Sequence, residues 1–204
     1  MYYGQFNPPV DWLIERFFAS GFIGSCVEVG AVDGRYLSNT LHFEESGWQC
    51  LCIEPNSYYH EALRRNRKMS MPYAMSDKNE DEVVLYRVQL TNNSFDAATS
   101  LVPDEKLLQQ LGHMIKGRDE IKVDMRTLDT CLEKTGWLKT DFVAIDTEGT
   151  ELTVLKGFDL ERWRPRLLVI ENNHDTPETT DYLRPRGYHK AIRHEVNDFY
   201  IRVI

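Results

Sequence analysis

The chain has 204 residues, a formal net charge of −8 and a hydrophobic fraction of 42%. Its length suits one α/β domain. Its negative charge argues against broad binding to nucleic acid or to membranes, because phosphate-rich surfaces would repel it. We therefore expect no nucleic-acid partner and no membrane association.

The four cysteines, at positions 26, 50, 52 and 131, favour a reducing compartment. Three of them lie in apolar runs, where free cysteine behaves as a small hydrophobe, and no CxxC pair supports a zinc site. The N-terminus lacks a basic region followed by an apolar core, and no apolar run approaches the length of a membrane span. We expect a cytoplasmic protein.

The first 76 residues alternate between helix and strand patterns. Apolar spacing and short apolar runs predict helices over 10–20, 36–46 and 58–67, and strands over 26–30, 49–53 and, more weakly, 71–75. The first helix belongs to an N-terminal helical extension, residues 1–24. We expect this extension to cover one face or edge of a sheet.

Residues 77–122 are the least regular part of the chain and form a variable insert or substrate-side segment. Within it we expect a strand at 82–89, a polar loop at 91–99 and a short helix at 103–111. Residues 121–125 alternate between apolar and polar side chains, which we interpret as an edge strand.

The alternation resumes at residue 128. The pattern predicts helices over 128–135, 151–156 and 178–184, strands over 142–145 and 167–170, and an antiparallel pair at 188–193 and 198–203. No repeat or flexible linker divides the chain. We therefore expect one domain over 1–204, with a doubly wound, mostly parallel α/β sheet.

Three predicted strands end in acidic residues, and glycine accompanies them in the first and third: VEVGAVDG at 27–34, CIEP at 52–55 and FVAIDTEGTE at 142–151. The carboxyl ends of parallel strands meet at a ligand crevice, so a nucleotide-type cofactor site is the leading hypothesis. Glu54 would accept hydrogen bonds from ribose hydroxyls. The GxGxxG of NAD-dependent dehydrogenases is missing, which disfavours that class.

These segments also resemble the FkbM-type family of S-adenosylmethionine-dependent methyltransferases. The likeness is carried by VEVGAVDGRYLSNT, GWQCLCIEPN, DFVAIDTEGTELTVLKGFD and LLVIENN, from about residue 26 to the end of the chain. It follows residues 77–122 only loosely and residues 1–24 not at all. The resemblance implies a Rossmann-like class I methyltransferase fold, a seven-stranded sheet whose last strand is antiparallel.

The resemblance also implies the contacts to the cofactor. They are, in chain order, Glu28, Gly30, Ala31, Asp33, Gly34, Asn39, Thr40, Glu54, Pro55, Ser76, Asp77 and Asp146. Those up to residue 34 would wrap the methionine part, and Glu54 would hold the ribose. Ser76 and Asp77 would lie beside the adenine. Asn39 and Thr40 would contact cofactor or substrate, the alternative being a capping and packing role.

A hydroxyl is a poor nucleophile at neutral pH, so methyl transfer to it requires a base or a divalent metal. The candidate catalytic residues are Asp146, Glu148 and His174. Asp146 ends the central predicted strand and should point into the crevice. His174 is either a general base near neutral pH or an incidental loop residue. Glu148 and Glu151 lie at a helix start, where carboxylates also cap free N–H groups, and we favour that role for Glu151.

Asp146 and the pair Glu171-Asn172 stand at adjacent strand ends. This arrangement resembles the catechol-type methyltransferases, which hold magnesium with an Asp and an Asp-Asn pair. Oxygen ligands favour a hard cation, so we expect Mg²⁺ or a similar divalent cation at Asp146, Glu171 and Asn172. Carboxylates close together at these strand ends would repel one another if no cation were bound. Raised pKa values or side chains that point in different directions are the alternative ways to relieve this repulsion.

The leading hypothesis is an O-methyltransferase acting on a hydroxyl of a sugar or small natural product. The alternatives are N-methylation of a small amine and a non-catalytic cofactor-binding subunit with a structural or regulatory role. The intact glycine turn, Glu54 and Asp146 argue against a non-catalytic protein. The sequence predicts a small-molecule or glycan acceptor without identifying it, and it predicts no oligomeric state.

Overall fold

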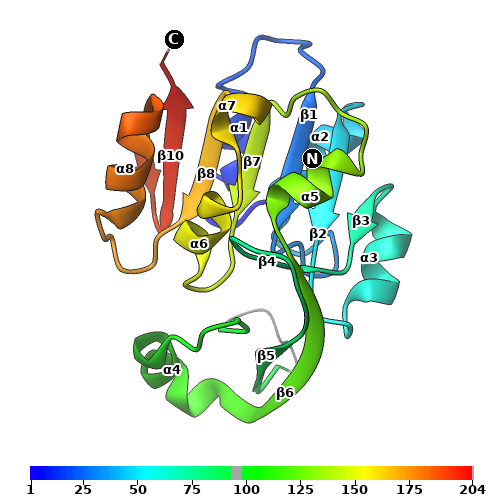
Figure 1. Ribbon diagram of the computed structural model, residues 1–204, viewed down its shortest axis with the longest axis vertical. Helices are drawn as coiled ribbons and strands as arrows, with labels where there is room; N and C mark the ends of the chain where they lie inside the picture. The colour runs from blue at the N-terminus through cyan, green and yellow to red at the C-terminus, as the bar shows by residue number, and fades with distance from the viewer. Residues whose placement is uncertain (93–97, 204) are drawn as a thin grey trace.

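A seven-stranded sheet forms the centre of the computed structural model, which describes residues 1–92 and 98–203 (Figure 1). Its strand order is β3-β2-β1-β7-β8-β10-β9. The strands are β1 (Ser25–Val29), β2 (Gln49–Ile53), β3 (Ser70–Met71), β7 (Phe142–Ile145), β8 (Leu167–Glu171), β9 (Tyr188–His194) and β10 (Asn197–Arg202). From β3 to β8 neighbouring strands are parallel, whereas β10 is antiparallel to both β8 and β9. The predicted fold class is confirmed.

Helices cover both faces of this sheet because its central strands are apolar on both sides. One face carries α5 (Leu128–Glu133), α6 (Glu151–Lys156), α7 (Leu160–Trp163) and α8 (Glu178–Leu183). These helices pack on alternate strand residues such as Val27, Val143 and Leu168. The other face carries α1 (Val10–Glu15) and α2 (Leu41–Glu45), which pack on the intervening strand residues. The remaining helix beside the sheet, α3 (His60–Asn66), lies next to β2 and β3 in Figure 1.

Two predicted helices are shorter by five residues or more in the structure. The helix expected at 10–20 ends at Glu15. The helix expected at 36–46 begins at Leu41, because residues 36–40 form a loop in which Leu37 has a φ of +53°. Residues 1–24 are thus mostly loop around α1. No described helix combines the length and the apolar character that a membrane crossing needs.

The third predicted strand, 71–75, is divided between two sheets. Ser70–Met71 forms β3 and pairs with β2, whereas Ala74–Met75 forms β4 and pairs with β6 (Ile115–Arg126). Pro72 separates the two strands, and proline has no N–H group with which to continue a ladder. The prediction of one continuous strand was therefore wrong.

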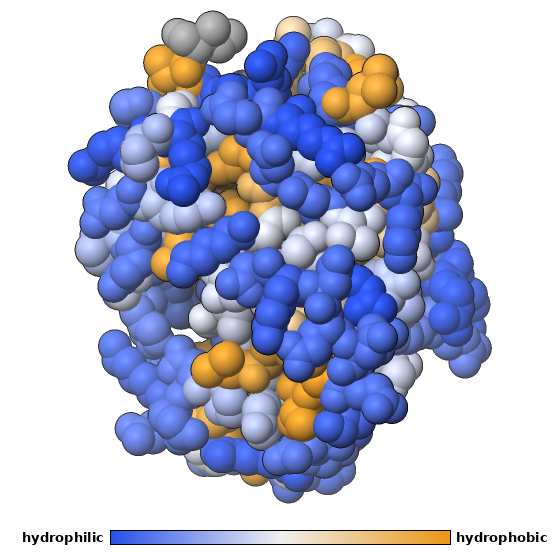
Figure 2. All heavy atoms as spheres, viewed as in Figure 1, coloured by the Kyte–Doolittle hydropathy of each residue, from blue (hydrophilic) through white to orange (hydrophobic). Residues whose placement is uncertain are grey.

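A second, three-stranded sheet has the order β4-β6-β5, with β5 spanning Glu80–Leu90. We call residues 80–92 and 98–126 the arm; it includes β5, α4 (Glu105–Leu111), the 3₁₀ turn Gly112–Met114 and β6. The arm extends beyond the carboxyl ends of the central strands in Figure 1, and hydrophobic side chains gather over it in the lower part of Figure 2. The polar loop predicted at 91–99 lies partly outside the described residues.

The predicted edge strand, 121–125, lies within β6, which is the central strand of the second sheet. Within β6, β4 pairs only with Met125 and Arg126, so residues 121–124 are paired on one side, with β5, among the described residues. The prediction was wrong for β6 as a whole, because alternation reports burial on one face of a strand and says nothing about its neighbours. Val123 and Met125 are the buried side chains of that stretch, and they pack against Leu85 and Ala74.

Candidate active site

A cavity of about 320 Å³ opens at the carboxyl ends of the central strands, between the main sheet and the arm. Its size lies in the usual range of small-molecule sites, roughly 300–1,000 Å³. The main-sheet wall includes Gly30, Glu54, Asp146 and Glu171. The arm contributes Leu85, Leu90 and Leu101, and the N-terminal segment contributes Gln5 and Val10. The acidic groups thus come from the strand ends, while the arm supplies a mainly apolar cover that also includes Asn92 and Thr99.

Glycine is required at the turn that follows β1. Gly30 has a φ of +84°, and a Cβ there would lie 1.9 Å from the backbone oxygen of Asp146. A side chain at Gly30 would therefore force apart the ends of β1 and β7. Because both residues line the cavity, this close approach fixes one of its walls.

Three other residues in the cavity wall have left-handed backbone conformations although they are not glycine. Val32, Leu37 and Glu148 have φ values of +49°, +53° and +57°. This conformation is strained for a β-branched residue such as Val32. Strained residues cluster at ligand-binding sites, where the surrounding structure holds them in place.

Glu54 presents a buried carboxylate at the end of β2. Its two oxygens accept hydrogen bonds from the backbone N–H groups of Val32 (3.0 Å) and Asn56 (2.8 Å). Burial raises the pKa of Glu54 to about 7; the N–H donors lower it, and the charge of Asp146 raises it further. Each carboxylate oxygen keeps a second acceptor site, so the group can still accept hydroxyl donors from the cavity.

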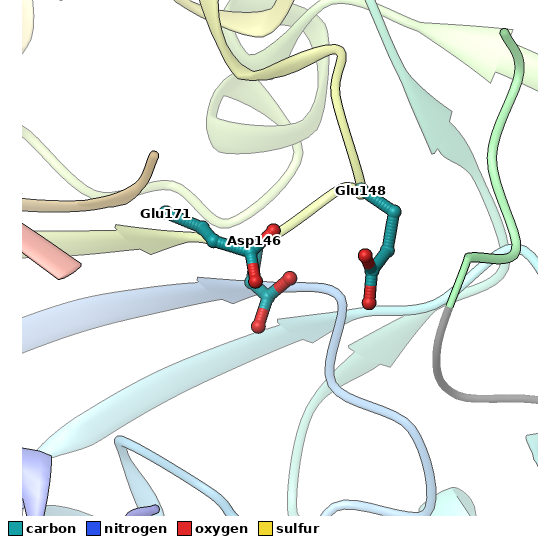
Figure 3. A group of neighbouring side chains, drawn as sticks. All are labelled: Asp146, Glu148 and Glu171. Carbon is teal, nitrogen blue, oxygen red and sulfur yellow. The ribbon is translucent and has the colours of Figure 1, made fainter. Parts of the chain in front are cut away.

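Three carboxylates converge on the other side of the cavity (Figure 3). Asp146, Glu148 and Glu171 each place one oxygen within 4.8 Å of the others, and we call them the carboxylate trio. Burial, followed by the charges of Asp146 and Glu148, holds the pKa of Glu171 well above its usual range. Carboxylates this close cannot all be ionised unless a cation compensates them, so the trio retains a proton or binds a positive charge.

The sequence profile described as "Methyltransferase FkbM domain" matches residues 28–190, more than three quarters of the chain. The chain belongs to this family. No curated protein sequence matches it.

A solved FkbM methyltransferase structure shares the fold, and other solved methyltransferases are more distantly similar. The FkbM methyltransferase of Methylobacillus flagellatus KT aligns over 88% of this chain with a TM-score of 0.56 and 16% identity. The aligned part is 43% of the M. flagellatus protein, so the present chain spans less than half of that protein. TrmK of M. capricolum, solved with S-adenosylhomocysteine, aligns over 94% of this chain and 65% of its own, with a TM-score of 0.46 and 9% identity. A putative O-methyltransferase from Klebsiella pneumoniae aligns over 98% and 82%, with a TM-score of 0.46 and 13% identity.

Six of the residues that the FkbM resemblance predicts at the cofactor line the cavity: Glu28, Gly30, Asn39, Glu54, Pro55 and Asp146. The other six are not among its lining residues: Ala31, Asp33, Gly34, Thr40, Ser76 and Asp77. Asp33 accepts hydrogen bonds from the N–H groups of Arg35 and Tyr36 within its own turn. Ser76 packs closely against Gly157. A Cβ added at Gly157 would lie 2.1 Å from the backbone oxygen of Ser76.

The metal ligands predicted from the sequence do not all converge. Asp146 and Glu171 are in the trio, but Asn172 is turned away. Its side-chain nitrogen donates to Asp198 and to the backbone oxygen of Thr176, both at 2.9 Å. Its side-chain oxygen accepts from the Thr176 N–H at 3.0 Å. Glu148 takes the third position because its left-handed turn directs it toward Asp146 (Figure 3).

His174 is not among the residues that line the cavity. Its Nε2 lies 2.6 Å from Oδ2 of Asp104, which also caps α4. His174 thus joins the loop after β8 to the arm. Glu151 accepts hydrogen bonds from the N–H groups of Thr147 and Gly149, which lie in the turn before α6. It therefore holds that turn, whereas the expected role was to cap the N–H groups of the helix itself.

Several residues that line the cavity were not predicted from the sequence. After β3 the wall is formed by Tyr73, Ala74 and Met75 rather than by the two residues that follow them. Pro72 was the available signal for these three residues. A proline interrupts the strand there, and the chain that follows pairs with β6 instead of β2. The arm residues Leu85 and Leu101 lacked any signal, since ordinary core leucines have the same appearance in a sequence.

Proposed function

We propose that the chain is an S-adenosylmethionine-dependent O-methyltransferase that acts on a hydroxyl of a sugar or small natural product. The observation that carries the proposal is one cavity of an FkbM domain that joins Glu54, at the end of β2, to the carboxylate trio. Glu54 as the acceptor for the ribose hydroxyls and the trio as the acceptor for a proton thus line the same cavity.

In this proposal different residues of the chain bind different parts of the cofactor. Glu54 accepts the ribose hydroxyls, and the apolar and aromatic wall of Tyr73, Ala74 and Met75 receives the adenine. Gly30 leaves room for the methionine part beside β7. When bound, S-adenosylmethionine supplies a methyl group on a positively charged sulfur, and the neighbouring trio offsets that charge.

The trio also provides the acid–base chemistry. As the acceptor oxygen bonds to the methyl carbon, its proton must leave, and a trio carboxylate can take it. Asp146 is the best placed, since it ends the central strand β7 and lines the cavity. The arm and the N-terminal segment hold the acceptor in line with the methyl group and exclude water.

Two finer alternatives follow from the negative charge of the trio. A protonated amine would be attracted to it, which favours N-methylation as the second candidate function. A divalent cation would also find hard oxygen ligands there. In that case Asp146, Glu148 and Glu171 would be the ligands, without Asn172.

Calorimetry with S-adenosylmethionine, S-adenosylhomocysteine and NAD tests the cofactor. The first two should bind and NAD should not. Glu54→Ala should weaken binding about ten- to a hundredfold, because a hydrogen bond to a charged group contributes about 1.5–3 kcal/mol. A folded wild-type protein that binds neither adenosyl compound would refute the proposal. Labelled S-adenosylmethionine with a panel of hydroxyl and amine acceptors then separates O- from N-methylation.

A further inference from the structure

The wall of the cavity carries negative charges without positive ones. Five of the described residues that line it are acidic: Glu28, Glu54, Asp146, Glu148 and Glu171. None of the described lining residues is lysine, arginine or histidine. The sequence of residues 88–105 contains none of these three residue types either. A ligand that enters the cavity therefore meets an excess of negative charge.

Two basic side chains close to the wall are held by acidic partners. Arg67 forms an ion pair with Glu28 at 3.2 Å, and its side chain is 0% exposed. Arg193 lies near the trio, because its Nη2 donates to the backbone oxygen of Asn172, and its Nη1 pairs with Asp198 at 2.9 Å. Arg67 thus neutralises Glu28, which leaves Glu54 and the trio as the acidic groups that face the cavity.

Backbone N–H groups are the other means by which a protein binds an anion, since a turn with several free N–H groups can hold a phosphate. In two turns at the cavity these donors are already occupied. The Val32 N–H donates to Glu54 at 3.0 Å. The N–H groups of Thr147 and Gly149 donate to Glu151 at 2.9 and 3.0 Å. Carboxylates of the protein itself thus take the positions that an anionic ligand would need.

Neutral polar groups face the same space. Gln5, from the N-terminal segment, and Asn197, at the start of β10, line the cavity together with the trio. Asn92 and Thr99 line it from the arm. Amides, hydroxyls and carboxylates supply donors and acceptors that match the hydroxyl groups of a polyol. The wall therefore suits a hydroxylated compound and lacks the groups that a phosphate requires.

We propose that the acceptor carries no phosphate or carboxylate group, and that the cavity excludes compounds in which such a group lies close to the hydroxyl to be methylated. This inference rests on the proposed function and names the charge class of its acceptor. A bound anion would lose its hydration and would face Glu54 and the trio without a compensating cation. S-Adenosylmethionine obeys the same rule, because its sulfonium and ammonium groups outnumber its single carboxylate.

The exclusion of anions places the reaction after the removal of phosphate from a sugar acceptor. Sugars activated as nucleoside diphosphates or as phosphate esters carry the groups that the cavity excludes. The reaction that supplies the acceptor is therefore one in which these groups leave. Glycosyl transfer releases the nucleoside diphosphate, and hydrolysis of a phosphate ester releases phosphate. Methylation follows such a step.

The exclusion is tested at the methyl position, where the identity of the acceptor is not needed. Alkylation of S-adenosylhomocysteine with iodoacetate or with iodoacetamide gives two sulfonium compounds of nearly equal size. The carboxymethyl compound carries a negative charge where the carbamoylmethyl compound is neutral. Calorimetry should show that the carboxymethyl compound binds at least about tenfold more weakly, with or without added Mg²⁺. Equal or tighter binding of the carboxymethyl compound in either condition would overturn the proposal.

Glu148→Gln tests whether the trio causes the exclusion, because it removes one charge and keeps the size of the side chain. The ratio between the two affinities should shrink in this variant. Glu120→Gln is the matched control, since Glu120 is exposed in β6 and is not among the lining residues. It should leave the ratio unchanged. A ratio that Glu148→Gln does not alter would contradict the role of the trio.

The acceptor itself is tested with labelled S-adenosylmethionine and sugars offered in pairs, each as a methyl glycoside and as the phosphate ester of that glycoside. Label should enter the uncharged members, and faster methylation of a phosphorylated partner would overturn the proposal. A protein that binds neither S-adenosylmethionine nor S-adenosylhomocysteine refutes the proposed function, and this inference with it. A protein that binds both and also prefers the carboxymethyl compound refutes the exclusion of anions alone.

Discussion

The chemistry of the cavity depends on how the carboxylate trio shares its charge. Asp146, Glu148 and Glu171 come within 4.8 Å of one another, and Oε2 of Glu171 is buried without a hydrogen-bond partner among the described residues. A shared proton and a bound cation both relieve this repulsion, but only a cation makes turnover depend on metal.

Asp146→Asn keeps the size of the side chain and removes its charge. We expect turnover to fall about 10²- to 10⁴-fold, the usual cost of losing an acid–base group. Product formation from labelled S-adenosylmethionine measures it. If the trio works by holding a proton, prior treatment with chelator leaves the wild-type rate unchanged. If it holds a cation, chelator abolishes the rate and added Mg²⁺ restores it.

Asp81→Asn is the matched control, since Asp81 is an exposed partner of Arg126 on the arm. Its turnover should equal that of the wild type. Near-normal turnover in a folded Asp146→Asn protein would contradict both versions of the chemistry and would leave the trio as a binding feature only.

The sequence predicted which strand ends meet at the cavity, but not how individual side chains use their acceptors. Glu28 and Glu54 both follow apolar runs and look equivalent in the sequence. Glu28 is engaged by Arg67, 39 residues away, whereas the donors to Glu54 among the described residues are backbone N–H groups of nearby turns. In the sequence Asn172 resembles a metal ligand. In the structure its amide oxygen accepts a hydrogen bond from the turn that follows it. Such long-range pairings leave no periodic pattern.

At the scale of elements, polar contacts between described residues join the arm to the main sheet near the cavity, among them two at the ends of β7 and β8. Ser100 Oγ donates to the backbone oxygen of Thr147 at 3.1 Å, and His174 meets Asp104 at 2.6 Å. Both contacts join the arm to loops that follow central strands. They position the apolar cover above the trio, so the arm is expected to influence acceptor binding more than the chemical step.

His174→Ala tests this view of the arm. We expect faster hydrogen exchange in α4, because Asp104 at its N-terminus loses a partner, and a change in turnover of less than about tenfold. The Michaelis constant for the acceptor should rise. Loss of turnover by about a hundredfold or more, with exchange in α4 unchanged, would instead support the general-base role predicted from the sequence.

The sequence predicted helices and strands correctly where both faces of a strand are buried under helices of the main sheet. Residues 142–145 and 49–53 match β7 and β2 because their continuous apolar runs lie between two helix layers. The prediction failed at 71–75, where the chain leaves the main sheet, and the edge strand predicted at 121–125 gains β4 as a second neighbour at Met125. Long-range contacts decide that these residues pair in a second sheet. In the sequence, Pro72 is the local feature that indicates this change of partner.

For the molecule as a whole, buried acids determine how stability depends on pH. Glu54 has its pKa raised from 4.5 to about 7 by burial, and that of Glu171 is raised well above its usual range for the same reason. Between pH 4.5 and 7 the folded protein therefore binds more protons than the unfolded chain. The free energy of unfolding must fall as pH rises through this window. Glu54 alone contributes at most about 3 kcal/mol to this fall, at 1.36 kcal/mol per pKa unit.

We expect the ligand-free protein to be more stable at pH 5.5 than at pH 7.5, which urea unfolding at a series of pH values measures. Glu54→Gln should flatten this dependence whatever its effect on the stability itself, because an amide does not titrate. Since ribose hydroxyls donate to the ionised carboxylate, affinity for S-adenosylhomocysteine should rise as pH passes through about 7, and that rise should disappear in the same variant. A wild-type stability that is flat or increasing from pH 5.5 to 7.5 would mean that Glu54 is better solvated than its buried position implies. The strand end would then be open to water before the cofactor arrives.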